Sequence, residues 1–229
     1  MGFFENSIFF GVILSFVSYG LGTMLQKKFK LPIFNPILVA TAIILVVLAV
    51  LHLDYNAYNA GAKYISFLLT PATICLAVPM YEKLELLKKN WKAVLVGIVS
   101  GVITSLCCIL VLCAVFRLSH EEFASLLPKS VTTAIAMGIS EELGGIVSIT
   151  VPIVVVTGIL GNIIAPFVCR VFRITEPVAR GVGIGTSSHA VGTARAMQMG
   201  EIEGAMSSLS IAVAGLITVV LAPLFAQLL

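Results

Sequence analysis

The most evident shortage in this chain is charge. Asp, Glu, Lys and Arg make up only 11% of its 229 residues, whereas soluble domains carry about 25%. The mean hydropathy is correspondingly high, at +1.09. A composition this apolar excludes an ordinary soluble domain and indicates a protein that lies in the lipid bilayer.

Catalytic and cofactor motifs are also lacking. The sequence contains no P-loop, no His-Glu-x-x-His helix and no Gly-x-Ser-x-Gly elbow, so we do not expect an enzyme. Its five cysteines stand inside apolar runs without the spacing of metal ligands, which favours packing roles. We therefore expect neither a metal ion nor another cofactor. The net charge of +3 comes from loop residues and gives no indication of nucleic-acid binding.

Long uncharged segments are what the sequence has instead. They cover residues 6–26, 31–51, 64–81, 93–116, 143–169 and 204–229. Each is close to or above the roughly 18–20 residues needed to cross the hydrocarbon core. Only helices and closed barrels satisfy their backbone in lipid, and the short alternating segments of a barrel are missing. We predict an all-α, polytopic integral membrane protein with six or more long spans and additional broken or re-entrant helices.

The distribution of basic residues predicts the orientation in the membrane. Lysines and arginines gather after the first, third and fifth long runs, at residues 27–30, 83–92 and 170–180. By the positive-inside rule these loops are cytoplasmic and the N-terminus is outside. All three basic loops lie on the cytoplasmic side only if residues 125–142 enter and leave the membrane on the same side. We therefore predict a re-entrant or broken segment there.

The chain also divides into two halves of similar plan. Residues 98–104 (IVSGVIT) resemble residues 212–218 (AVAGLIT), and in each half an interrupted polar segment precedes the long apolar run. Paired interrupted segments are typical of the binding sites of secondary transporters. We predict a single membrane transport domain, 1–229, with related halves at 1–117 and 118–229.

The first polar segment that attracts notice spans residues 128–143. Pro128 suits the first position of a helix, whose free N–H groups and positive dipole end would attract an anion. The candidate ligands there are Lys129, Ser130, Thr132 and Thr133. The alternative is that the lysine reaches the membrane interface while the hydroxyls bond to carbonyls of the preceding turn.

The second polar segment spans residues 181–197. A break near Ser188 would bring four polar side chains onto neighbouring faces, and these are Ser187, Ser188, His189 and Thr193. Histidine changes charge near neutral pH, so coupling to protons is one interpretation of His189. The other is that its ring is simply a satisfied hydrogen-bonding group.

Three further residues complete the predicted solute site. Thr70 and Thr73 flank Pro71 and would contribute from the first half. Asn162 lies inside a long apolar run, where a polar side chain needs a partner, so it is expected to face the bundle. The spacing of Gly97 and Gly101 predicts close helix packing, and we expect a homodimer on that basis.

Several motifs resemble the LrgB/CidB family of membrane proteins. They are residues 69–82 (LTPATICLAVPMYE), 128–137 (PKSVTTAIAM), 157–161 (TGILG) and 185–194 (GTSSHAVGTA). The resemblance extends over nearly the whole chain. Ala134 departs from it, because the family commonly has proline at that position.

The resemblance implies a multi-pass protein of the bacterial cell membrane. Bacterial members are described as holin/antiholin-like regulators of murein hydrolase export and cell lysis, alongside a smaller LrgA/CidA-type membrane partner. Plastid relatives are glycolate/glycerate translocators, and some bacterial pairs are linked to pyruvate uptake.

We therefore expect a transporter that moves a small monocarboxylate of the glycolate, glycerate or pyruvate type by alternating access. Lys129 would hold the carboxylate, and the hydroxyls and imidazole of the second segment would bond the hydroxyl or keto oxygen. The alternatives are a holin/antiholin-like regulator without a solute of its own, and a purely structural partner of an LrgA-type subunit.

Overall fold

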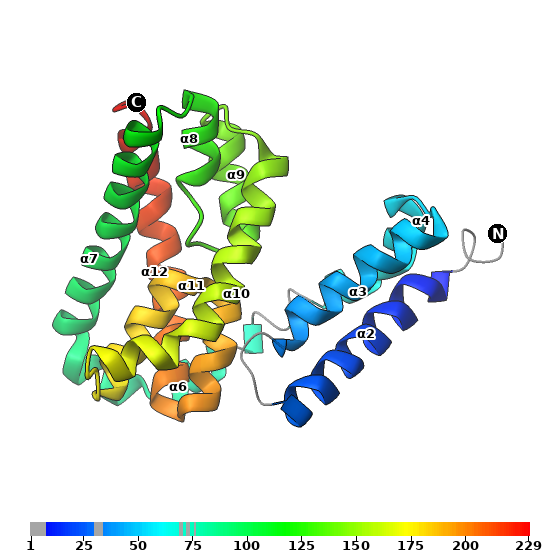
Figure 1. Cartoon of the computed structure of the whole chain (residues 1–229). Helices are drawn as coiled ribbons and strands as arrows, with labels where there is room; N and C mark the ends of the chain where they lie inside the picture. Colours follow the sequence, from blue (N-terminus) through cyan, green and yellow to red (C-terminus); the bar gives the residue numbers. More distant parts are fainter. Residues whose placement is uncertain (1–7, 30–33, 69–70, 72–73, 76) are drawn as a thin grey trace. The chain divides into compact units, whose positions relative to one another are not determined.

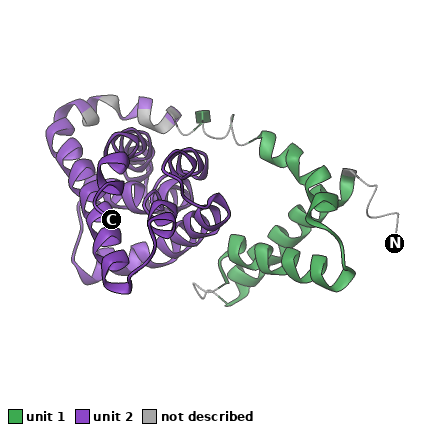
Figure 2. Cartoon of the chain, turned by 90° about the horizontal axis from the view of Figure 1, so that it is seen from above, with its two compact units in different colours: residues 1–75 green, residues 76–229 purple. Residues whose placement is uncertain are grey.

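Every regular element of the described chain is a helix, which confirms the all-α prediction. The computed structural model describes residues 8–29, 34–68, 71, 74–75 and 77–229. The helices are α2 Ile8–Phe29, α3 Pro36–Leu51, α4 Tyr55–Phe67, α6 Ala77–Glu82, α7 Leu84–Phe116, α8 His120–Leu126, α9 Thr133–Glu142, α10 Val147–Val171, α11 Pro177–Met199 and α12 Glu201–Ala226 (Figure 1). They form two compact units, Met1–Cys75 and Leu76–Leu229 (Figure 2).

Four of the described helices are long and apolar enough to cross a membrane. They are Phe9–Phe29, Lys88–Phe116, Val147–Val171 and Glu201–Ala226. This supports a membrane protein but does not confirm six or more spans. The run 31–51 yields only the 16-residue helix α3, and in the run 64–81 helix α4 already ends at Phe67.

Helix α3 is short because its start is fixed by a capping residue. The Asn35 side chain accepts a hydrogen bond from the Ile37 N–H at 2.9 Å, and Pro36 occupies the first helical position. Asparagine at the N-cap followed by proline is a strong helix-start signal. The helix therefore begins several residues after the apolar run does.

In unit 1, helices α2, α3 and α4 pack through small residues. Gly11 of α2 lies against the backbone of Ala62 in α4, and Gly22 lies against the backbone of Pro36 at the start of α3. The hydroxyls of Ser15 and Tyr58 are 2.8 Å apart. Close packing of backbones on glycine is how membrane helices gain van der Waals contact without a hydrophobic driving force.

In unit 2, the glycines predicted to form a packing face on α7 contact another helix of the same chain. A methyl group on Gly97 would lie 3.1 Å from Val182, and one on Gly101 would lie 3.0 Å from the Thr186 hydroxyl. Helix α11 therefore covers this face. The packing interpretation is confirmed, but the face is occupied, so it gives no support to the predicted homodimer.

The chain reverses direction between α7 and α8. Arg117 takes a left-handed conformation (φ 53) at the end of α7, and Ser119 and Glu122 form a capping box that starts α8. Such reciprocal bonds satisfy two donors that would otherwise be orphaned at a helix start. Helices α8 and α9 lie at the upper end of unit 2 in Figure 1, while α11 occupies the lower half.

Helix α11 consists of two arms that fold back on each other. At His189 the backbone leaves the helical region, with φ 42 and ψ −144. A methyl group on Gly192 would lie 3.1 Å from Cγ2 of Ile184, although the same stretch of unbroken helix would separate these residues by about 12 Å. The predicted break near Ser188 is therefore present, one residue later.

Contacts with α12 show the same reversal. Gly181, near the beginning of the first arm, lies against Glu203, and Met197, near the end of the second arm, lies against Gly204. Both ends of α11 are thus beside the first turn of α12. The element is a helical hairpin whose tip is formed by residues 187–190.

The packing of the first arm on α12 can be tested with two neighbouring glycines. A methyl group on Gly185 would meet the carbonyl oxygen of Ser207 and lie 2.8 Å from Cβ of Ser210, whereas around Gly183 the space is open. Overpacking typically costs about 1–3 kcal/mol. We expect Gly185→Ala to lower the melting temperature of the purified protein in detergent by several degrees.

Gly183→Ala is the matched control. It lies on the same arm and should leave the melting temperature unchanged or raise it slightly, because alanine favours helix by up to about 1 kcal/mol over glycine. Equal melting temperatures for the two variants would contradict the hairpin packing.

Candidate functional site

A cavity of about 560 Å³ lies in unit 2 between α10 and the first arm of α11. This volume is in the range of small-molecule sites. Its polar lining comes from Lys129, Thr157, Arg180, Ser187 and Ser188, and the rest is mainly aliphatic side chains of α10. The two polar segments singled out by the sequence therefore meet at one cavity.

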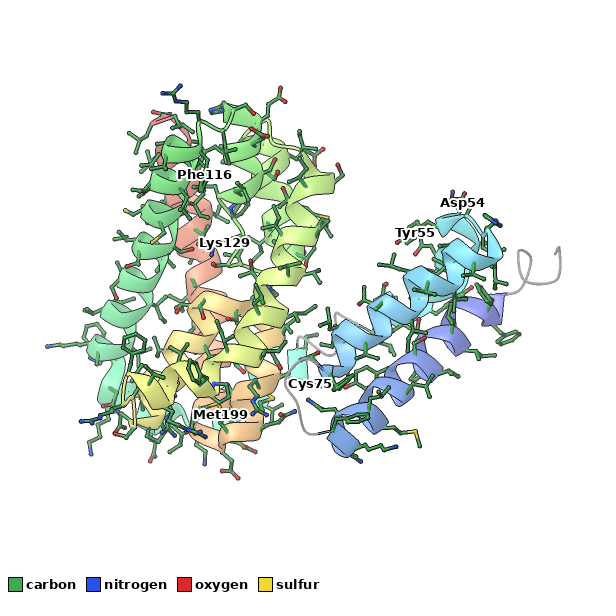
Figure 3. All side chains as sticks on the ribbon, in the orientation of Figure 1. Asp54, Tyr55, Cys75, Phe116, Lys129 and Met199 are labelled. Atoms are coloured by element: carbon green, nitrogen blue, oxygen red, sulfur yellow. The ribbon has the colours of Figure 1, made fainter. Side chains whose placement is uncertain are left out.

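Lys129 lies in the link between α8 and α9, not in a helix. The prediction that Pro128 starts a helix is wrong, because α8 ends at Leu126 and α9 begins only at Thr133. The Lys129 ammonium donates to the Ser130 hydroxyl at 3.0 Å, and that hydroxyl is 3.1 Å from the hydroxyl of Ser105 on α7. Figure 3 places Lys129 about halfway along unit 2.

The link containing Lys129 turns back toward the end of the unit from which it came. The Ser125 hydroxyl, at the end of α8, accepts a hydrogen bond from the N–H of Ile146 at 2.7 Å. At the end of α9, the Thr150 hydroxyl donates to Ser140 at 2.7 Å. Both helices are thus fastened to the beginning of α10. These contacts do not test whether the segment re-enters the membrane, so re-entry stays a prediction.

The tip of the α11 hairpin brings two serines to the cavity. Their hydroxyls are 3.0 Å apart, and Ser187 also donates to the carbonyl oxygen of Gly183 at 2.8 Å. Ser188 packs directly on Gly161 of α10. Ser187 is exposed and Ser188 is buried, so the pair presents one accessible hydroxyl beside one that is held in place.

His189 fastens the hairpin tip to α10. Its Nε2 is 2.9 Å from the carbonyl oxygen of Val154, and its ring lies against Gly158, where a methyl group would come within 2.6 Å of it. The side chain is buried and is not among the described residues that line the cavity. This geometry matches the alternative of a satisfied hydrogen-bonding group.

Asn162 also holds the tip. Its side-chain amide donates to the carbonyl oxygen of Val191 at 2.8 Å, across the interface between α10 and the second arm. The prediction that Asn162 faces the bundle is confirmed. This hydrogen bond is to the protein backbone, so the structure gives Asn162 a positioning role.

Ser130 bonds to Lys129 but is not among the described lining residues of the cavity, and three more predicted ligands lie apart from it. Thr193 is fully buried, and its hydroxyl bonds to the Ser207 hydroxyl at 2.6 Å. Thr132 and Thr133 form the N-cap and first residue of α9 and are not among the described lining residues. The remaining predicted ligands, Thr70 and Thr73, fall outside the residues that the structure describes.

Two polar lining residues were missed by the sequence analysis. Thr157 was noted only within a family motif, and Arg180 was counted only as a loop charge. Arg180 donates from Nε to the carbonyl oxygen of Ile174 at 2.7 Å and lies 3.6 Å from the Glu203 carboxylate. A signal for Arg180 was available, because Glu203 is an acidic residue at the start of an apolar run and needs a partner.

No metal site was found in the part of the chain that the structure describes. No group of three or more His, Cys, Asp or Glu side chains is suitably placed there. The polar groups that could contact a ligand are therefore one ammonium, one guanidinium and several hydroxyls. Such a set suits an anion with hydrogen-bonding oxygens.

Comparison with known proteins identifies the family. The description "LrgB-like family" matches residues 15–228. The chain belongs to the LrgB family. It is 39% identical to proteins named "Antiholin-like protein LrgB" from Bacillus cereus (strain B4264) and Bacillus anthracis (strain CDC 684 / NRRL 3495), over 95% of this chain and 95% of each relative. No solved structure matches.

The attachment of the hairpin tip predicts a local effect of Asn162. In this LrgB-family chain Asn162→Ala removes the bond to Val191, and a net loss of about 1 kcal/mol corresponds to about fivefold more frequent opening. We expect amide hydrogen exchange in residues 187–193 to accelerate by about that factor. Ser148→Ala, an exposed position on the same helix, is the control and should leave these amides unchanged.

Proposed function

We propose that this protein transports small carboxylate anions across the membrane. The observation that carries the proposal is the cavity shared by Lys129 and the α11 tip, Ser187 and Ser188. Polar and ionisable groups at membrane depth are costly and usually mark the path of a solute. A small monocarboxylate with a hydroxyl or keto oxygen has the oxygen atoms that this set of donors can bind.

Lys129 is the proposed carboxylate ligand. An ammonium has three N–H donors, and one of them is directed to Ser130 in this structure. The two that remain can serve the two oxygens of a carboxylate. The link between Ser130 and Ser105 holds this group against α7, so the charge has a fixed place in the site.

Ser187 and Ser188 are the proposed ligands for the second oxygen function of the solute. Their hydroxyls are adjacent and lie at the point where α11 reverses. Interrupted helices whose ends face a central site are the usual construction of secondary transporters. Alternating access would then require the α11 tip to separate from α10, breaking the contacts of His189 and Asn162.

The proposal predicts a defined effect of removing the charge at the site. We expect wild-type protein in liposomes to take up labelled glycolate, glycerate or pyruvate, and Lys129→Gln to reduce that uptake at least tenfold. The reason is that the carboxylate loses the ammonium group among the described lining residues while the cavity keeps its size. Initial uptake rates at several solute concentrations provide the measurement.

Lys88→Gln is the control, because it removes one exposed positive charge at the start of α7, outside the described lining of the cavity. It should transport like the wild type. Absence of uptake by the wild type would reject the transport proposal, and equal uptake by Lys129→Gln would reject Lys129 as a ligand.

Antiholin-like regulation of cell lysis is the second candidate function. The names of the Bacillus relatives favour it more directly than they favour transport. In this proposal the chain would act with a smaller LrgA-type membrane partner in the bacterial cell membrane, and the cavity would have no solute of its own.

The two candidates differ in their dependence on the cavity. We expect an antiholin-like function to survive Lys129→Gln, because regulation through a partner depends on the outer helix surfaces. The measurement is release of a cytoplasmic marker from bacteria that lack their own LrgB and express either protein. Loss of protection in the variant, at equal membrane levels, would tie the lysis effect to the cavity instead.

A further inference from the structure

Three arginines surround a second cavity, where α10 ends and α11 begins. This cavity has a volume of about 470 Å³ and is lined by Arg170, Arg173 and Arg180, together with Thr175 and Met199. None of the described residues that line it is acidic. A concave site with three positive charges and no acidic lining residue attracts anions.

The second cavity adjoins the cavity of Lys129. Arg180 and Cys169 line both of them, so Arg180 stands at the junction. Its guanidinium is held there by the carbonyl oxygen of Ile174 at 2.7 Å and the carboxylate of Glu203 at 3.6 Å. An anion bound at Arg170 and Arg173 would therefore lie next to Arg180, which also lines the inner cavity.

The outer two arginines differ from Arg180 in having free side chains. Within the described part of the chain, neither Arg170 nor Arg173 makes a side-chain hydrogen bond or an ion pair, and both are exposed. A free guanidinium presents a planar fork that binds a carboxylate or a phosphate through two parallel hydrogen bonds. These two residues are thus available to a ligand.

We infer that the cavity of Arg170, Arg173 and Arg180 captures small anions and passes them to the Lys129 site. The inference rests on the proposed transport function and adds an entrance with a defined charge. Clefts lined by one sign of charge raise the local concentration of counter-ions and their association rates by about 10–1,000-fold. By the distribution of basic loops this entrance faces the cytoplasm.

Capture predicts an effect on apparent affinity and not on the maximal rate. We expect the double variant Arg170→Gln/Arg173→Gln to raise the KM for labelled glycolate five- to tenfold in inverted membrane vesicles, with the maximal rate within twofold of wild type. The difference should shrink at about 0.5 M salt, where the Debye length falls to a few ångströms. In right-side-out vesicles KM should not change.

Lys88→Gln/Lys89→Gln is the matched control, since it also removes two exposed positive charges, at the start of α7. It should leave KM unchanged in both kinds of vesicle. A similar rise of KM in this control, or an unchanged KM in the arginine variant, would overturn the capture role.

The same arginines could bind an anionic lipid headgroup instead of the solute, and the lipid composition of the liposomes distinguishes these two ligands. Capture of the solute requires the effect in purely phosphatidylcholine liposomes. An effect that occurs only when anionic lipid is added would assign the arginines to a headgroup and overturn the capture role.

Equilibrium binding of labelled glycolate to the purified protein distinguishes failure of this inference from failure of the proposed function. Binding that weakens in the arginine variant, with no transport by the wild type, would keep the capture site and reject transport. Binding of equal strength in the variant and the wild type would reject the capture site alone. Absence of glycolate binding by the wild type would reject both.

Discussion

The close approach of the α11 tip to α10 is the contact on which the site depends. A side chain at Gly158 would meet the His189 ring, and one at Gly161 would meet the Ser188 hydroxyl. These glycines, about one turn apart on α10, leave the space that the tip fills. With larger residues there, His189 could not reach the Val154 carbonyl, and each buried polar group that lost its partner would cost about 1–3 kcal/mol.

The two chain reversals that frame the cavity are built differently. The α8–α9 reversal uses the six residues between the two helices, 127–132, and the Ser130 hydroxyl, which contacts Ser105 of α7, holds Lys129. The α11 reversal depends on one residue, His189, in a left-handed conformation that costs a non-glycine residue about 1–3 kcal/mol. The ring and backbone contacts of the tip offset that cost, so the same contacts that position the serines also maintain the reversal.

Much of this arrangement could be predicted from the sequence, for physical reasons that differ by element. Four of the six long apolar runs correspond to helices long enough to cross a membrane, because length and hydropathy suffice to predict such helices. The polar segments were recognisable because polarity within apolar runs is rare. The start of α9 was misplaced because proline also suits the turn that follows a helix, which is where Pro128 lies. The hydrogen-bond partner of the His189 ring was not predictable, since Val154 is distant in sequence.

The basic side chains along the two cavities differ in whether the protein holds them in place. Arg170 and Arg173 are exposed and free among described partners, Arg180 is fixed by Glu203 and Ile174, and Lys129 is fixed by Ser130. Glu203 neutralises part of the charge at the junction and helps to hold the Arg180 guanidinium there, where it lines both cavities. In the proposed pathway, Lys129 supplies the next positive charge that an anion would meet after Arg180, because both line the inner cavity. In the proposed transport function a cation would meet repulsion at each of these side chains, so their positions would favour anions over cations.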